Sequence, residues 1–162
     1  MTPSPPPVTG SAVRAATLDD VDDIERIIAE AFTPYIDRIG RAPAPMTVDY
    51  ASLVRHTGQV HVVLDGDDDG ETVGVLVTVD EPDHVFVDTI AVSAAGRGRG
   101  FARVLFEFVE ERARARGCGE VRLYTNAAMT ENLELYPHLG FVEVDRRVDE
   151  GFDRVYFVKA VT

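Results

Sequence analysis

Three glycines alternate with two arginines between Gly96 and Gly100, directly before a segment with helical periodicity. The start of a helix exposes unpaired N–H groups and the positive end of the helix dipole, so it attracts anions. Glycine lets an anion approach the backbone without meeting a Cβ atom, and arginine supplies planar donors suited to phosphate. The stretch therefore predicts a phosphate-binding loop. The alternative is a flexible turn with solvated arginines.

The spacing excludes two common phosphate motifs. A nucleotide-binding P-loop ends in Gly-Lys-Ser/Thr, but the chain has one lysine, Lys159. A dinucleotide loop has the pattern Gly-x-Gly-x-x-Gly, whose last position falls on Phe101 or Arg103 here, depending on the starting glycine. The pattern that does fit is Arg-x-x-Gly-x-Ala, from Arg97 to Ala102.

Composition narrows the partners and the compartment. The 162 residues carry 28 acidic against 16 basic side chains, which argues against nucleic acid and favours cationic substrates such as amines. The lone Cys118 excludes an intramolecular disulfide, and the four histidines lack metal-ligand spacing, so we expect no metal. No apolar run approaches membrane-spanning length, so no membrane partner is expected. We expect a cytoplasmic protein, with residues 1–10 a disordered Pro-rich tail and residues 11–162 one domain.

The elements that must position the loop alternate between strands and helices. Periodicity predicts a single α/β domain with about seven strands and four helices. The expected strands span 11–15, 59–64, 72–79, 84–92, 120–125, 141–148 and 154–161. The expected helices run from a cap at Thr17 to near Pro34, from a cap at Thr47 to about His56, from Phe101 to Gly117, and over 131–140.

Three segments have particular predictions. The strand over 84–92 is β-branched with few polar interruptions, which is typical of a strand buried on both faces. The stretch 35–46 holds a glycine and two prolines, so we expect it to be irregular. The acidic turn over 65–71 lacks the ligand spacing of a calcium loop and is interpreted as a solvated hairpin turn.

Residues 97–102 resemble the signature Arg/Gln-x-x-Gly-x-Gly/Ala of the GNAT N-acetyltransferase superfamily, whose loop amides hold the pyrophosphate of acetyl-coenzyme A. The resemblance extends to "YPHLGF" at 136–141, which is similar to the family's Tyr-x-x-x-Gly-Phe element, and covers roughly Ser11 to Val161. Ala94 stands where the family usually has proline, and Met129 where many members have asparagine. The resemblance implies a GNAT-like, three-layer α/β/α fold with a mixed, centrally splayed sheet.

The implied function is transfer of an acetyl group from acetyl-coenzyme A to a primary amine of a small molecule or peptide. The alternative is a noncatalytic acyl-coenzyme A-binding regulatory module. The acceptor and the oligomeric state stay open, with a homodimer as one alternative.

The resemblance also implies cofactor contacts. The pantetheine arm would lie between the strands at 84–92 and 120–125, with the Val92 N–H facing the thioester oxygen. Asn126 and Asn132 are included as cofactor contacts, and the alternative is that either of them caps a helix or turn. The implied contacts are Ile90, Ala91, Val92, Arg97, Gly98, Arg99, Gly100, Phe101, Ala102, Asn126 and Asn132.

Two residues are candidates for catalysis. The resemblance puts Tyr136 beside the coenzyme A sulfur as a proton donor, and the alternative is a core tyrosine with its hydroxyl bonded to backbone. Asp88 is the only carboxylate inside the apolar strand, and its parity with Phe86, Ile90 and Val92 predicts that all four share one face. Burial would raise the Asp88 pKa, as a base requires, whereas a structural aspartate or a base acting through water are the alternatives.

Other side chains are weaker candidates. Glu81 and His84 are alternative bases, expected at the start of the same strand. By analogy with the family, the loop over 38–46 and Tyr50 would cover the acceptor mouth. There Arg38 and Arg41 could hold an acceptor carboxylate, or could be solvated surface arginines.

Overall fold

The computed structural model describes residues 11–67 and 69–162. The expected disordered tail at 1–10 lies outside these residues. These described residues form seven strands: β1 (Ser11–Ala15), β2 (Val60–Asp65), β3 (Glu71–Asp80), β4 (Val85–Val92), β5 (Glu120–Asn126), β6 (Val142–Asp149) and β7 (Phe152–Ala160). The α-helices are α1 (Val21–Phe32), α2 (Ile36–Ile39), α3 (Tyr50–His56), α4 (Phe101–Ala115) and α5 (Thr130–His138).

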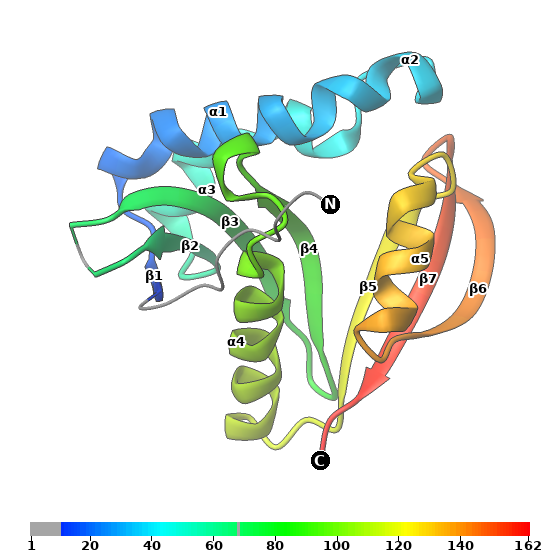
Figure 1. Ribbon diagram of the computed structural model, residues 1–162. Coiled ribbons are helices and arrows are strands. Elements are labelled where there is room, and N and C mark those ends of the chain that lie inside the picture. Colours follow the sequence, from blue (N-terminus) through cyan, green and yellow to red (C-terminus); the bar gives the residue numbers. More distant parts are fainter. Residues whose placement is uncertain (1–10, 68) are drawn as a thin grey trace, which may run out of the picture.

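The strands form one mixed sheet in the order β1-β2-β3-β4-β5-β7-β6. Every neighbouring pair is antiparallel except β4 and β5, which are parallel. That parallel pairing runs only from Val85–Val121 to Val87–Leu123. Beyond it the two strands diverge toward their carboxyl ends, as Figure 1 shows. The expected centrally splayed sheet is confirmed.

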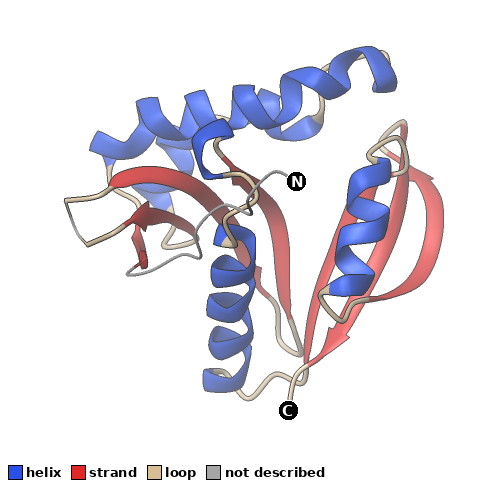
Figure 2. Cartoon of the chain, viewed as in Figure 1, coloured by secondary structure: helices blue, strands red, loops and turns tan. Residues whose placement is uncertain are grey.

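Helices cover both faces of the sheet and give three layers (Figure 2). On one face, α1 and α3 close a core with β2 and β3 that includes Ile24, Ile27 and Tyr50. On the other face, α4 and α5 close a second core that includes Phe101, Leu105 and Tyr136. The helices α1 and α4 each bury an apolar stripe against the sheet, one on each face, so the α/β/α prediction is confirmed.

The segment before β2 differs from its prediction. The helix α3 begins at Tyr50, because the Asp49 carboxylate accepts a hydrogen bond from the Ser52 N–H at 3.0 Å. Thr47 is therefore not the cap and ends a short 3-10 turn that begins at Ala44. The stretch expected to be irregular also contains the single-turn helix α2. This helix is additional to the four that were expected.

The strand β4 is not buried on both faces. Its residues alternate between buried and half-buried along the whole strand. Three of the half-buried residues, Asp88, Ile90 and Val92, line the space opened by the splay, so this strand forms a wall of that space as well as part of the core. No helix in residues 11–67 and 69–162 is long and apolar enough to cross a membrane.

Candidate active site

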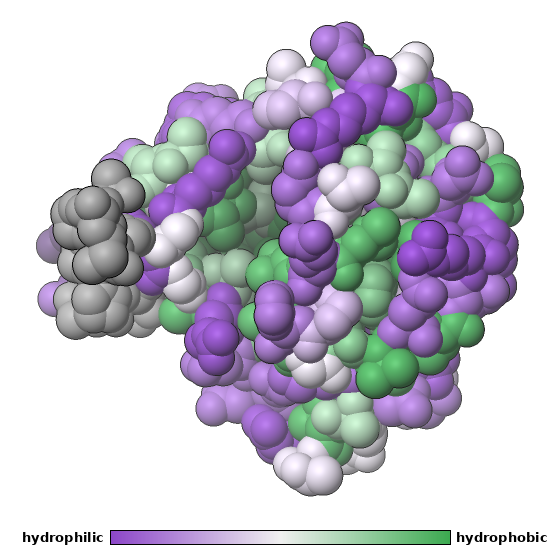
Figure 3. All heavy atoms as spheres, turned by 45° about the vertical axis from the view of Figure 1, so that its right-hand side comes forward, coloured by the Kyte–Doolittle hydropathy of each residue, from purple (hydrophilic) through white to green (hydrophobic). Residues whose placement is uncertain are grey.

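A cleft of about 1020 Å³ opens where β4 and β5 diverge. Its walls come from α1, the α2 region, the glycine loop, the start of α4, α5 and the start of β7. Figure 3 shows a hollow with a largely hydrophobic floor and a mostly hydrophilic rim. The cleft thus joins the glycine loop to both sheet halves.

The glycine loop reaches this cleft through unusual backbone conformations. Gly98 and Gly100 have φ values of 74° and 94°, in the left-handed region that favours glycine. The helix α4 begins directly afterwards at Phe101, and Gly98, Gly100, Phe101 and Ala102 all line the cleft. The unpaired N–H groups of the first turn of α4 therefore lie at the wall of the cleft.

The loop arginines divide into two kinds. Arg97 lines the cleft and donates a hydrogen bond to the Glu30 carbonyl at 3.0 Å. Arg103, in the first turn of α4, also lines the cleft and was not predicted. Arg99 is not brought to the cleft, because its guanidinium donates to both carboxylate oxygens of Asp65, at 2.7 and 3.1 Å.

A β-bulge in β4 changes which side chains share a face. Val77 pairs with Thr89 but Thr78 pairs with Val87, so Asp88 has no partner on β3. Such an extra residue reverses the alternation of side chains beyond it.

The predicted common face of Asp88 with Ile90 and Val92 is therefore wrong. Ile90 and Val92 pack on the core beneath α4, which Val87 also joins. Asp88 instead interacts electrostatically with Tyr124 and Arg154, on the face where Phe86 contacts Tyr124.

The Asp88 carboxylate is half-buried in the wall of the cleft. It has no hydrogen-bond partner among the described residues. Burial raises the pKa of Asp88, and the positive charge of Arg154 acts in the opposite direction. The site thus holds a carboxylate that is accessible from the cleft and binds a proton more readily than a solvated aspartate.

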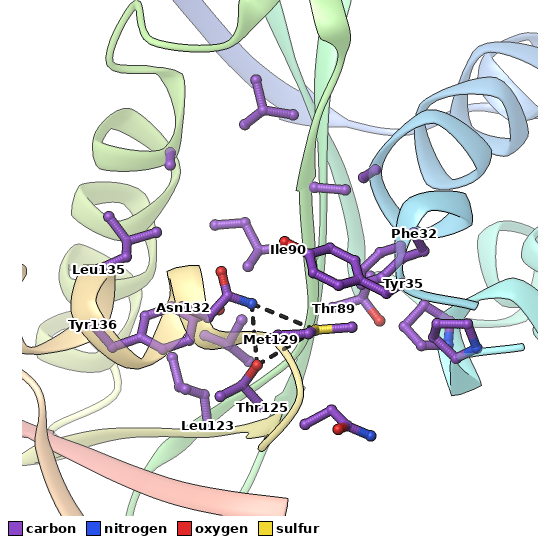
Figure 4. A pocket seen from close by; sticks show the side chains of 18 of the residues that line it. Phe32, Tyr35, Thr89, Ile90, Leu123, Thr125, Met129, Asn132, Leu135 and Tyr136 are labelled. Carbon is purple, nitrogen blue, oxygen red and sulfur yellow. Dashed lines mark hydrogen bonds between the residues drawn. The ribbon is translucent and has the colours of Figure 1, made fainter. Parts of the chain in front are cut away.

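Tyr136 lies on α5 and is 5% exposed. Its ring packs against those of Phe106, Phe141 and Phe157, with centroids 5.5 to 6.0 Å away. The hydroxyl makes no hydrogen bond within the described part of the chain, contrary to a core tyrosine bonded to backbone. Burial raises the pKa of the phenol, so Tyr136 keeps its proton at neutral pH. Figure 4 shows Tyr136 beside Asn132 at the wall of the pocket.

The two asparagines line the cleft in different ways. Asn132 donates to the Thr125 hydroxyl at 3.1 Å and lies 3.6 Å from the Met129 sulfur, a cluster drawn in Figure 4. Asn126 accepts from the Ala128 N–H at 2.9 Å, which is the turn-capping role considered for it. Asn132 therefore fixes α5 against β5 at the splay.

The end of the cleft away from the glycine loop is bridged by polar contacts. Tyr35 and Arg38 both donate to the Glu131 carboxylate on α5, at 2.9 and 2.8 Å. Arg41 donates to the Glu150 carbonyl at 2.8 Å, in the turn between β6 and β7. These bonds join the segment around α2 to the sheet half on the other side of the splay.

Several residues of this end were not predicted. Tyr124, Phe152 and Arg154 line the cleft from β5 and β7. Arg154 is 5% exposed and lies 4.2 Å from the Tyr124 ring centroid. The sequence shows which side chains alternate along each of these strands, but it does not show the register that places β7 beside β5.

The weaker candidates lie elsewhere. His84 hydrogen-bonds to Asp83 and borders a second cavity at the opposite end of β4, and Glu81 also does not line the cleft. Tyr50 is buried and donates to the Pro45 carbonyl at 2.6 Å. It supports the wall of the cleft from behind and does not line it.

Comparisons with known proteins agree on one family. The family model described as "Acetyltransferase (GNAT) family" matches residues 21–141. N-alpha-acetyltransferase 80 of Mus musculus is 41% identical over 63 residues, 39% of this chain but 19% of that protein's length. The Uncharacterized N-acetyltransferase YjgM of Escherichia coli (strain K12) is 29% identical over 140 residues, 82% of this chain and 83% of the relative.

A solved structure extends the similarity in fold. Ard1 from Thermoplasma volcanium superposes with a TM-score of 0.73, covering 95% of this chain and 99% of that chain. At 16% sequence identity this likeness concerns the fold alone.

Proposed function

Because this chain belongs to the GNAT acetyltransferase family, we propose that it transfers the acetyl group of acetyl-coenzyme A to a primary amine of a small molecule or peptide. The observation that carries the proposal is the cleft itself. Within one cavity it combines a glycine loop at a helix start, a half-buried carboxylate and a buried tyrosine.

The chemistry of the cleft fits acetyl-coenzyme A. Gly98 and Gly100 present bare backbone before the first turn of α4, which suits a pyrophosphate. Arg97 and Arg103 add positive charge, whereas Arg99 would first have to leave Asp65. When bound, acetyl-coenzyme A supplies the acetyl group as a thioester.

The strand β4 supports the rest of the cofactor. Its residues Ile90, Ala91 and Val92 lie beyond the last pair with β5, so their backbone groups on that side have no strand partner. A ligand in the splay can satisfy these groups. Phe101, Ala102 and Asn132 complete the proposed contacts, while Asn126 is engaged in its turn.

Two side chains would move the protons. An amine must lose its proton before it can attack, and the Asp88 carboxylate is proposed to accept that proton. The Tyr136 hydroxyl, which has no other hydrogen-bond partner in the described residues, is proposed to donate toward the leaving group. The two groups approach from different elements, β4 and α5, on either side of the splay.

We also propose that the protein works in the cytoplasm. Cys118 is buried and unpaired, which suits a reducing compartment.

The test is amine-dependent release of free thiol from acetyl-coenzyme A across a panel of primary amines, with the acetylated product identified by mass spectrometry. Coenzyme A affinity is measured in parallel by calorimetry. Turnover that requires both the amine and the enzyme supports the proposal. Tight coenzyme A binding with no turnover on a broad panel would favour the noncatalytic binding module.

A further inference from the structure

The glycine loop needs contacts from outside itself to hold one conformation. Three of its five residues, from Gly96 to Gly100, are glycine, which loses more conformational freedom on ordering than any other residue. The chain enters the loop from β4 through a 3-10 turn, Ala94–Gly96, whose cap Ser93 accepts from the Gly96 N–H at 3.2 Å. The Ala94 N–H, at the first position of this turn, has no acceptor within the turn. It therefore needs a partner from another element.

Glu30, near the end of α1, provides that partner. Its Oε2 accepts from the Ala94 N–H at 3.0 Å, and its backbone carbonyl accepts from Nη2 of Arg97 at 3.0 Å. The 3-10 turn lies beside α1 in Figure 1. One residue of α1 therefore holds both the chain that enters the glycine loop and an arginine within the loop.

The Glu30 carboxylate is itself held in place. Its Oε1 accepts from Arg26, one turn earlier on α1, at 3.3 Å. The hydrogen bond from the Ala94 N–H is the largest cause that lowers the pKa of Glu30 below 4.5, so the carboxylate accepts this bond as an anion at neutral pH. The helix is fixed in turn, because Ile27 and Ile28 are buried in the core. The bond thus joins the loop to a rigid element, which positions a binding group more precisely than another loop would.

Glu30 itself does not line the cleft, whereas Arg97, Gly98 and Gly100 do. We infer that Glu30 is a positioning residue for coenzyme A, because it holds the glycine loop and Arg97 in the conformation that receives the phosphates. Its carboxylate acts through the Ala94 N–H, and its carbonyl acts through Arg97. This inference rests on the proposed function, since the phosphates are those of the proposed cofactor.

The first test removes the carboxylate. Glu30→Ala should raise the Kd for coenzyme A about tenfold in calorimetry, because the loop loses a hydrogen bond to a charged group. Glu30→Gln keeps an oxygen that can accept from the Ala94 N–H, so it should raise the Kd less. In steady-state kinetics, Glu30→Ala should raise the KM for acetyl-coenzyme A by the same factor and leave kcat within about twofold, because Glu30 does not touch the reacting groups.

The second test removes the donor. Proline has no N–H and is suited to the first position of a helical turn, and the ψ of 161° at Ser93 lies in the region favoured before proline. Ala94→Pro therefore removes the hydrogen bond to Glu30 and is compatible with the turn. In the Ala94→Pro background, Glu30→Ala should change the Kd by less than about twofold, because its partner is already gone.

Glu25→Ala is the matched control, because it removes an exposed carboxylate from the same helix. It should leave the Kd unchanged, and its midpoint of urea unfolding should match that of Glu30→Ala. Hydrogen exchange in the cofactor-free protein, measured by mass spectrometry, should become faster over residues 93–100 in Glu30→Ala and not in Glu25→Ala.

Two results would overturn the inference. An unchanged Kd in Glu30→Ala, even with a lowered urea midpoint, would give Glu30 a structural role alone. A tenfold loss of affinity that persists in the Ala94→Pro background would show that the carboxylate does not act through the Ala94 N–H. Failure of the proposed function is a separate outcome, in which coenzyme A binds but no amine is turned over. The binding comparison still decides the role of Glu30 in that case.

Discussion

At the scale of single residues, burial acts on both proposed catalytic groups and gives them opposite tasks. Removing water disfavours the charged form of each group, so it raises the pKa of Tyr136 and that of Asp88. The phenol thereby keeps its proton and can only donate. The pKa of the Asp88 carboxyl group is raised from its usual value of 3.8, so the group accepts a proton more readily than a solvated aspartate and can release it again.

Tyr136→Phe tests the proton donor. The substitution keeps the ring against its aromatic neighbours and removes a hydroxyl that has no hydrogen-bond partner in the described residues. Steady-state kinetics should show a fall in kcat of roughly 10²–10⁴-fold with coenzyme A affinity nearly unchanged. Thermal unfolding should change little. A phenylalanine variant that turns over at the parental rate would remove Tyr136 from the mechanism.

Asp88→Asn tests the base through the pH profile. Only the ionised carboxylate can accept a proton, so kcat/KM of the parent enzyme should rise with pH through the Asp88 pKa, which lies above 3.8. The asparagine variant should be slower at every pH and should lack this rise. An unchanged acidic limb in the variant would assign that limb to the acceptor amine or to another group.

At the scale of elements, the proposed role of the glycine loop depends on the start of α4 directly behind it. Gly100 occupies the residue before the helix with φ of 94°, so any other residue there is strained. A side chain at this position would also enter the space where the pyrophosphate is proposed to lie.

Gly100→Glu should therefore abolish coenzyme A binding in calorimetry, because it adds bulk and negative charge. Gly117→Glu is a suitable control, since Gly117 also has a positive φ and follows the other end of α4, with open space around it. Unchanged coenzyme A affinity in Gly100→Glu would show that the loop does not bind the phosphates. Loss of affinity in both variants would point to a general effect of backbone strain.

The elements also show what the sequence could predict and where it stopped. The order of strands and helices and the glycine loop followed from local spacing, because each depends on neighbours within a few residues. The bulge at Asp88 could not be predicted from the sequence, because it arises from the register of β4 against β3. The pairing of Arg99 with Asp65 joins residues 34 positions apart, so local spacing could not predict it. Because of this pairing, Arg99 does not line the cleft, although it was predicted to contact the cofactor.

At the scale of the whole molecule, ion pairs join distant elements in a chain of net charge -12. Asp80 at the end of β3 accepts two hydrogen bonds from Arg112 on α4, at 2.9 and 2.7 Å. The hydrogen bonds from Arg112 lower the pKa of Asp80 below 3.8. A carboxylate with a lowered pKa stabilises the fold above its unfolded pKa, and this stabilisation is lost as the pH falls through the folded pKa.

Asp80→Asn should therefore lower the free energy of unfolding at pH 7 by about 1–2 kcal/mol. The difference from the parent should shrink as the pH falls below 3.8. Urea unfolding at several pH values measures both effects. Asp153→Asn, at an exposed position on β7, is the control and should change neither. A constant difference between parent and Asp80→Asn across the pH range would contradict the role of the charge.

The splay between β4 and β5 has a further consequence for the protein on its own. Beyond Val87 and Leu123 each strand presents an open sheet edge inside the molecule, and such edges recruit strands from other chains. A ligand bound in the splay would cover both edges and so protect the folded protein from aggregation. Light scattering during heating should then show a higher aggregation onset with coenzyme A than without it, and an identical onset would contradict this.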